Sequence, residues 1–217
     1  MRLTSVNLGR AKELAVGDRT IQTGIYKRPV LSTVHVGHLG LDGDTVVDKR
    51  AHGGPDQAVY VYGSEDYDWW AMGIGRPLEP GTFGENLTVD GLLSADYAVG
   101  DRLEIGATVV LEVTAPRMPC NTLAQKMGKP QYVKLFRDSE RPGLYCRVVV
   151  EGSIRVGDIV TLVPFEGDRV TMLELFRAHY AKQTPEEALR RFLAAPLSER
   201  LRKEKLEQLE RQTAPAP

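Results

Sequence analysis

Two patterns of apolar residues divide the chain. Up to about residue 165, short runs rich in Val, Ile, Leu and Tyr stand between Gly, Pro and Asp, which is typical of β-strands joined by turns. Many short strands with turn signals indicate a barrel or a sandwich. We predict strands at residues 4–8, 30–36, 58–62, 87–89, 102–105, 109–113, 144–150 and 159–163.

Three segments within this region have helical features instead. Residues 64–72 are rich in aromatic side chains and are followed by Gly73. Asn121 is suited to cap a helix over residues 121–127, and Gly128 is suited to end it. Residues 130–137 are predicted to form a third short helix.

The end of the chain has a different pattern. All 21 glycines lie at or before Gly167, and apolar residues then recur at helical spacing. Thr184, Pro185 and Glu187 predict a capping box at the start of the second of three helices. We expect these helices at residues 171–180, 185–193 and 198–209. Two domains are therefore predicted, a strand-rich domain over 1–165 and a three-helix domain over 166–217.

Composition and charge exclude several classes of protein. The 217 residues carry 28 Lys and Arg against 29 Asp and Glu, so no strong overall field draws nucleic acid or an anionic membrane. Two cysteines cannot form a dense disulfide framework. The sequence has no apolar run of signal-peptide or membrane-span length. We therefore expect a cytoplasmic protein that binds neither membrane nor nucleic acid.

The run at residues 114–122 is the most informative for chemistry. Pro116 and Pro119 flank Arg117, and Cys120 follows at the start of a predicted helix. A thiol at a helix start with a cation three residues before it is biased toward thiolate. Thiolate is the form that acts as a nucleophile or a soft metal ligand. A buried structural cysteine is the alternative, and the two prolines and the arginine favour a functional one.

A second run places Gly53 and Gly54 directly after His52. Paired glycines let backbone amides approach an anion closely, and Lys27 and Arg50 add positive charge. The residues alone leave two interpretations open, a phosphate or oxyanion site and a surface turn that leads into a strand.

A third run contains Asn86, whose amide can both donate and accept hydrogen bonds. The alternative to a binding role for Asn86 is a capped turn, and spacing alone favours the capped turn. A hydrolase built from Cys120 and His52 is a further alternative, but the sequence offers no evident oxyanion hole or orienting third residue.

Five runs occur in one order along the chain: residues 40–44 (GLDGD), 52–58 (HGGPDQA), 83–87 (FGENL), 100–101 (GD) and 116–120 (PRMPC). Together they resemble the MOSC family, the module that is also found at the C-terminus of molybdenum cofactor sulfurases. The predicted helical tail resembles the three-helix extension of the YiiM-like branch of that family.

The resemblance implies a mostly β fold with inserted helices, a MOSC-type β-barrel followed by a small three-helix bundle. It also implies a molybdenum cofactor, a molybdopterin whose dithiolene holds the metal. Cys120 is then the expected metal ligand and a catalytic residue, and His52 the expected proton donor. The residues expected to bind the cofactor are Lys27, Arg50, His52, Gly53, Gly54, Gln57, Asn86, Arg117, Asn121 and Arg147.

The activity that the resemblance implies is the reduction of N-hydroxylated compounds, such as N-hydroxylated purine base analogues, which detoxifies them. Two cysteines do not suffice for an iron–sulfur cluster, so electrons are expected from a separate flavin or iron–sulfur reductase. A molybdenum cofactor carrier or sulfur-relay protein is the alternative function, and a pure interaction protein is another. The tail helices could cover the barrel, form a homodimer or dock the electron donor.

Overall fold

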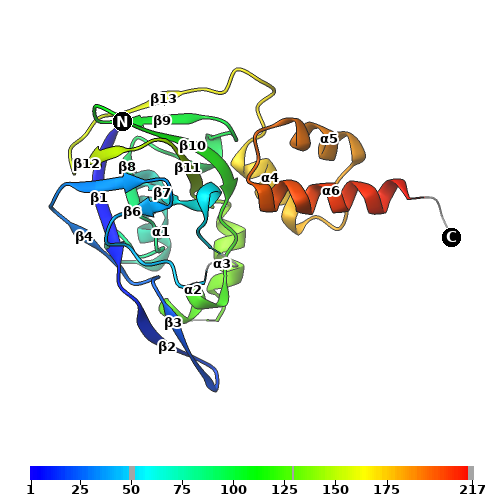
Figure 1. Cartoon of the computed structure of the whole chain (residues 1–217). Helices are drawn as coiled ribbons and strands as arrows, with labels where there is room; N and C mark the ends of the chain where they lie inside the picture. Colours follow the sequence, from blue (N-terminus) through cyan, green and yellow to red (C-terminus); the bar gives the residue numbers. More distant parts are fainter. Residues whose placement is uncertain (49–51, 129, 215–217) are drawn as a thin grey trace.

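A large curved sheet dominates the computed structural model, which describes residues 1–48, 52–128 and 130–214 (Figure 1). Within these residues eight strands pair in the order β13-β9-β10-β11-β7-β8-β1-β4. All neighbours are antiparallel except β7 and β8, which are parallel. The strands are β1 (Arg2–Gly9), β4 (Lys27–Val30), β7 (Val59–Gly63), β8 (Leu87–Asp90), β9 (Arg102–Ile105), β10 (Val109–Pro116), β11 (Leu144–Val150) and β13 (Val160–Val163).

The sheet curls so that β1 meets the chain at the start of β13. The backbone nitrogen of Leu3 donates to the Asp158 carbonyl at 2.9 Å, and that of Val160 donates to the Met1 carbonyl at 3.1 Å. The sheet carries fully buried side chains such as Leu3, Val61 and Leu111. The predicted fold class, mostly β with inserted helices, is confirmed.

Two small sheets complete the strand-rich region. One contains β12 (Gly152–Ile154), β5 (Val34–Gly37) and β6 (Gly40–Leu41). The predicted strand at 30–36 is wrong as a single element, because β4 ends at Val30 and β5 pairs with β12 in this other sheet. Leu31, between the two strands, is 90% exposed.

The other small sheet is a hairpin of β2 (Lys12–Val16) and β3 (Arg19–Thr23), which projects from the body (Figure 1). Gly17, with φ of +59°, makes its turn. The hairpin was not predicted as strands because most of its residues are exposed, so the alternation of burial rests on few side chains, Leu14 and Val16 in β2 and Ile21 and Thr23 in β3.

Short helices fill the connections at the positions that the sequence predicts. They are α1 (Ser64–Ile74), α2 (Asn121–Lys126) and α3 (Tyr132–Ser139), with 3₁₀ turns η1 (Pro55–Gln57) and η2 (Ser94–Asp96). Trp70 of α1 stacks on Tyr132 and Phe136 of α3 with centroid separations of 5.8 and 6.1 Å. These aromatic contacts fix α1 and α3 to each other.

The three predicted tail helices are α4 (Met172–Tyr180), α5 (Glu186–Ala194) and α6 (Glu199–Thr213). Thr171 and Glu174 form the capping box of α4. The capping box predicted at Thr184 is wrong, because α5 begins at Glu186 and its N-cap position falls on Pro185.

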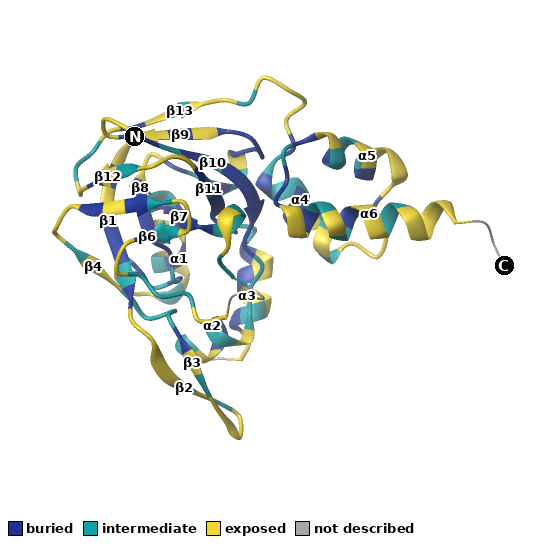
Figure 2. Cartoon of the chain, viewed as in Figure 1, coloured by how far each residue is buried: buried dark blue, intermediate teal, exposed yellow. Residues whose placement is uncertain are grey.

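Figure 2 shows that the tail helices bury their inner faces, whereas the outer half of α6 is exposed. The domain boundary at 165/166 stays a prediction, since buried residues of the tail and body belong to one hydrophobic cluster.

Candidate functional site

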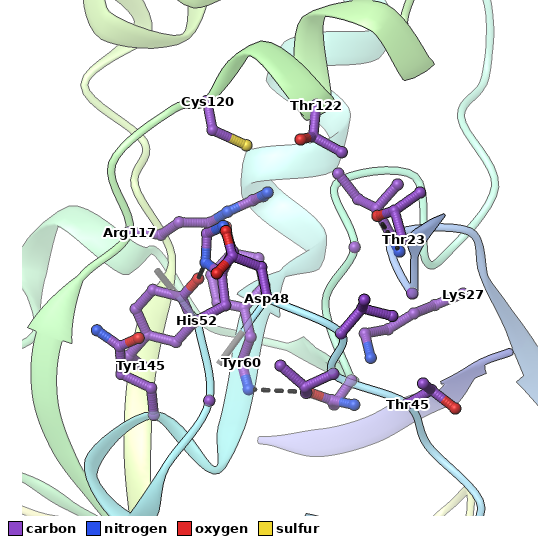
Figure 3. A pocket seen from close by; sticks show the side chains of 18 of the residues that line it. Thr23, Lys27, Thr45, Asp48, His52, Tyr60, Arg117, Cys120, Thr122 and Tyr145 are labelled. Carbon is purple, nitrogen blue, oxygen red and sulfur yellow. Dashed lines mark hydrogen bonds between the residues drawn. The ribbon is translucent and has the colours of Figure 1, made fainter. Parts of the chain in front are cut away.

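A cavity of about 200 Å³ opens where distant segments of the chain meet (Figure 3). Its walls come from the end of β3, the chain after β6, the turn before η1, and the starts of β7, α2 and β11. Seven of the predicted residues line it: Lys27, His52, Gly53, Gln57, Asn86, Arg117 and Cys120. The fold therefore gathers runs that lie up to 93 residues apart in sequence (Lys27 to Cys120) into one cavity.

Cys120 occupies the N-cap position of α2. Burial raises the pKa of its thiol, but a hydrogen bond with His52, the charge of Arg117 and the Leu123 amide lower it further, to about 6. Thiolate is therefore the main form at neutral pH, as the sequence predicts. The second cysteine differs, because burial within β11 raises the pKa of Cys146 well above its usual range.

Arg117 is a buried cation in the cavity wall, only 4% exposed. Its Nη1 donates to the Phe83 carbonyl, and its guanidinium lies 5.0 Å from the centroid of the Tyr60 ring. Burial lowers its pKa, but Tyr60, Tyr145 and Cys120 raise it more, so it stays charged. Its Nε is buried and has no hydrogen-bond partner among the described residues. A buried donor of this kind is suited to an acceptor from a bound ligand.

Lys27 and Asn86 are both tied to Asp44 (residues 40–44 form the first motif run). Lys27 forms an ion pair with Asp44, and burial lowers the pKa of the lysine more than Asp44 raises it. Asn86 donates to Asp44 at 2.9 Å through Nδ2 and accepts the Tyr60 amide at 3.1 Å through Oδ1. Asn86 thus holds Lys27's partner in place, in addition to lining the cavity.

His52 shares a hydrogen bond of 2.9 Å between its Nδ1 and the Tyr145 hydroxyl. Burial raises the pKa of Tyr145, so the hydroxyl stays protonated. Sequence reasoning missed Tyr145. No local pattern separates Tyr145 from its buried neighbours Leu144 and Cys146 in β11.

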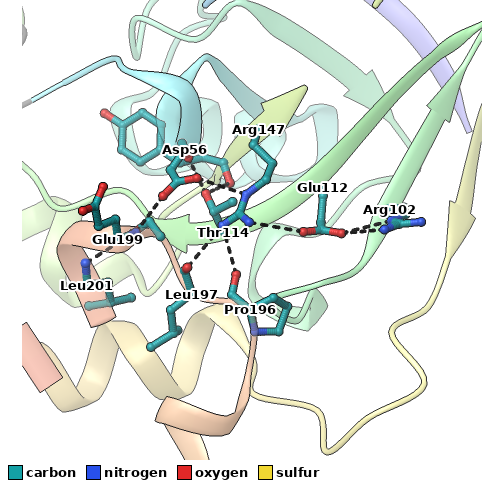
Figure 4. A network of polar contacts seen from close by, with 11 residues as sticks. Asp56, Arg102, Glu112, Thr114, Arg147, Pro196, Leu197, Glu199 and Leu201 are labelled. Carbon is teal, nitrogen blue, oxygen red and sulfur yellow. Dashed lines mark hydrogen bonds and ion pairs between the residues drawn. The ribbon is translucent and has the colours of Figure 1, made fainter. Parts of the chain in front are cut away.

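The structure does not bring every predicted residue to this cavity. Arg147 is not among its lining residues, and its Nη2 donates instead to the carbonyls of Pro196 and Leu197 at 3.2 Å (Figure 4). Its Nε also lies 3.1 Å from Asp56 Oδ1. The expectation that Arg147 lines the pocket is thus wrong, because partners from the tail hold its side chain elsewhere.

Two other predicted residues that the structure describes, Gly54 and Asn121, also lie outside the lining of this cavity. Both neighbour lining residues in sequence. Arg50 lies outside the described residues.

Two further charged residues, Glu85 and Lys126, form hydrogen bonds with the loops next to the cavity. Glu85 is fully buried and accepts hydrogen bonds from the Gly81 amide at 2.5 Å and the Tyr67 hydroxyl at 2.6 Å. Burial raises its pKa. Lys126 donates to the carbonyls of Ile25 at 2.9 Å and Gly81 at 2.6 Å, and burial lowers its pKa to about 8. Both residues hold the loops that frame the cavity, and no local pattern marks Lys126 as different from a surface lysine.

Comparison with known proteins identifies the family. The family model described as MOSC domain matches residues 48–161. This chain belongs to the MOSC domain family. It is 37% identical to the uncharacterized protein YflK of Bacillus subtilis, over 90% of this chain and 88% of YflK. It is also 33% identical to a protein of Gibberella moniliformis named reductase, over 74% of this chain and 29% of that longer protein.

The fold also matches a solved member of the branch that the tail resembles. The crystal structure of YiiM from Geobacillus stearothermophilus superposes with a TM-score of 0.79 at 30% identity, covering 96% of this chain and 98% of that one. The expected family and fold are both confirmed. No helix in the described residues has the length and apolar character needed to span a bilayer.

Proposed function

We propose that this protein is a molybdenum-cofactor-dependent reductase of N-hydroxylated compounds, with purine base analogues among its substrates. The observation that carries the proposal is the pairing of a thiolate-forming cysteine, Cys120, with a buried arginine whose Nε lacks a partner, in the wall of one cavity. Membership of the MOSC family and similarity to a protein named reductase support the same assignment.

The residues at the cavity fit this cofactor. A thiolate is a soft ligand for a transition metal, and Cys120 supplies one. A molybdopterin is anionic at its phosphate, and Lys27 and Arg117 are cations on the same cavity. Gly53 lines the cavity with its backbone, and an added Cβ would lie 2.9 Å from Val46 on the same wall.

The proposed roles of the residues follow from these contacts. When bound, the cofactor supplies two-electron redox chemistry at its metal. Cys120 would hold the metal, and Lys27, Arg117 and the Gly53 backbone would hold the cofactor's anionic groups. The Tyr145 hydroxyl orients the His52 ring, which places a proton carrier next to Cys120. Arg50 remains an expected phosphate contact.

A separate protein with a flavin or an iron–sulfur cluster would supply the electrons, because Cys120 and Cys146 are the cysteines of this chain and one of them is needed as ligand. Both are free thiols, which fits our proposal that the protein works in the cytoplasm.

The test is to express the protein in a host that makes the cofactor and to measure bound molybdenum and turnover together. A chemically reduced viologen replaces the unknown electron donor, and the substrate is an N-hydroxylated purine. We expect Cys120→Ala to lose both molybdenum and turnover, whereas Cys146→Ala keeps them. Undiminished turnover of Cys120→Ala with stoichiometric molybdenum would refute the ligand role. A loaded protein that reduces no N-hydroxylated compound would indicate a cofactor carrier or sulfur relay instead.

A further inference from the structure

A second cavity, of about 290 Å³, lies on the tail side of Cys120. Strand β10 and the segment after it contribute Pro116 and Met118, whereas α6 contributes Arg200, Leu201 and Glu204. It shares Cys120, His52, Gln57 and Tyr145 with the first cavity. Cys120 and its hydrogen-bonded neighbours therefore stand where the two cavities meet.

We propose that this tail-side cavity binds the substrate and that α6 forms the wall that selects it. The two cavities differ in chemistry. The first has the buried cations Lys27 and Arg117 on its wall, which suits an anion. The second has a mainly apolar surface, although polar residues also line it. Its charged side chains, Arg200 and Glu204, are of opposite sign and one helical turn apart, and His179 of α4 lies 3.9 Å from Glu204. An anionic cofactor is favoured in the first cavity, which leaves the second for another molecule.

The lining predicts the chemical class of that molecule. Prolines, Met118 and Leu201 offer apolar surfaces to a ring, and opposite charges at the edge exert no net attraction on an ion. The ligand is therefore an uncharged small molecule with an apolar ring, and its reactive end reaches Cys120 and His52. This inference rests on the proposed function, because it makes that molecule the N-hydroxylated substrate.

The wall formed by α6 is fixed to the body by several contacts (Figure 4). The Ser198 amide donates to the Thr114 carbonyl at 3.1 Å, and the Ser198 side chain caps the helix at Leu201. Arg147 holds the two carbonyls just before Ser198. The cavity is thus preformed, and the tail becomes part of the active site rather than an accessory.

The test fills the cavity from either side. Leu201→Trp enlarges the side chain on α6, and Met118→Trp enlarges the opposite wall. Leu206→Trp is the matched control, because Leu206 lies on the same helix, is 43% exposed and does not line the cavity. The probe is N-hydroxybenzamidine, an uncharged ring that carries an N-hydroxyl group, and its binding to the cofactor-free full chain is followed by ligand-observed NMR.

We expect both filling variants to raise the Kd of the probe at least tenfold, and the control to leave it unchanged. In the loaded enzyme the same variants should raise KM tenfold with unchanged molybdenum content. Unchanged binding by either filling variant, when its thermal unfolding is like that of the wild type, overturns the proposal. Failure to bind the probe in the wild type also overturns it. If the filling variants lose binding while the loaded wild type shows no turnover, the cavity assignment stands and the proposed activity fails.

Discussion

The carboxylate of Asp56 accepts a hydrogen bond of 2.6 Å from the backbone nitrogen of Glu199, 143 residues later in the chain. Asp56 lies in η1, three residues after Gly53, and Glu199 is the first residue of α6. The carbonyl of Asp56 also accepts the Thr114 hydroxyl at 2.5 Å. The tail is thereby joined to the segment that carries His52 and Gln57.

Replacing Asp56 by Ala should weaken this junction. The Glu199 amide loses its acceptor and Arg147 loses a carboxylate, so the free energy of unfolding should fall by about 1–3 kcal/mol. Denaturant unfolding measures the change. Asp138→Ala is the control, since Asp138 makes an exposed ion pair with Lys134 one turn away, a contact of about 0.5 kcal/mol. Equal losses in the two variants would mean that the junction adds no stability.

Local sequence was sufficient to predict the thiolate character of Cys120. Arg117 is three residues away and the start of α2 follows directly, so two of the interactions that lower the thiol's pKa lie within one short segment. The hydrogen bond with His52 lowers this pKa as well, and it depends on a contact across 68 residues of sequence. The order of strands and helices could also be predicted from local patterns. The break between β4 and β5 could not, because it depends on pairing with β12, more than 100 residues later.

Arg147 shows why the direction of a side chain could not be predicted from the sequence. Its position on a strand next to the site was correct, but its direction depends on carbonyls at Pro196 and Leu197, about 50 residues later. Lys126 shows the opposite case, in which a lysine of ordinary sequence context is buried by contacts with Ile25 and Gly81. Tertiary partners of this kind leave no local signal.

The thiol of Cys120 should be reactive at mildly acidic pH. With a pKa of about 6, its alkylation rate in the cofactor-free protein should rise through pH 6 and level off near pH 7. Removing the Arg117 charge or the His52 hydrogen bond makes the thiolate less favourable, so Arg117→Gln and His52→Ala should move this midpoint upward.

Alkylation with iodoacetamide across pH 4–9, followed by intact mass, measures this midpoint. Cys146 is fully buried and should not react in the folded protein. Arg76→Gln serves as control, since Arg76 is exposed and does not line the cavity. A midpoint near 8.5, the value of a free thiol, in the wild type would contradict the prediction.

Glu85 should make stability depend on pH. Burial raises its pKa in the folded state, so the folded protein binds more protons than the unfolded chain just above the ordinary pKa of a glutamate. Its contribution is therefore fully present below that pKa and is lost as pH rises through the folded-state pKa. Gln keeps an oxygen for the Gly81 and Tyr67 donors but carries no charge, so Glu85→Gln should gain stability relative to the wild type as pH rises above the ordinary pKa of a glutamate.

Urea unfolding at several pH values measures this difference. Glu79→Gln is a suitable control, because the Glu79 side chain makes no hydrogen bond or ion pair in the described residues. A stability difference between Glu85→Gln and wild type that stays constant with pH would rule out a raised pKa.

Gly53 and Gly54 should respond differently to alanine although they are adjacent. Both have positive φ, +78° and +81°, so a side chain at either position is strained by about 1–3 kcal/mol. A Cβ on Gly54 would meet nothing within 4 Å, whereas one on Gly53 would lie 2.9 Å from Val46, which lines the cavity of the proposed cofactor. Gly53→Ala should therefore lower molybdenum occupancy well below that of Gly54→Ala at a similar loss of stability.

Metal analysis and thermal unfolding of the two variants test this, with Gly73→Ala as the control. Gly73 lies in α1 with open space around it, so alanine there should leave metal content unchanged and raise stability by about 0.5–1 kcal/mol. Equal molybdenum occupancy in Gly53→Ala and Gly54→Ala would show that the Gly53 backbone does not face the cofactor.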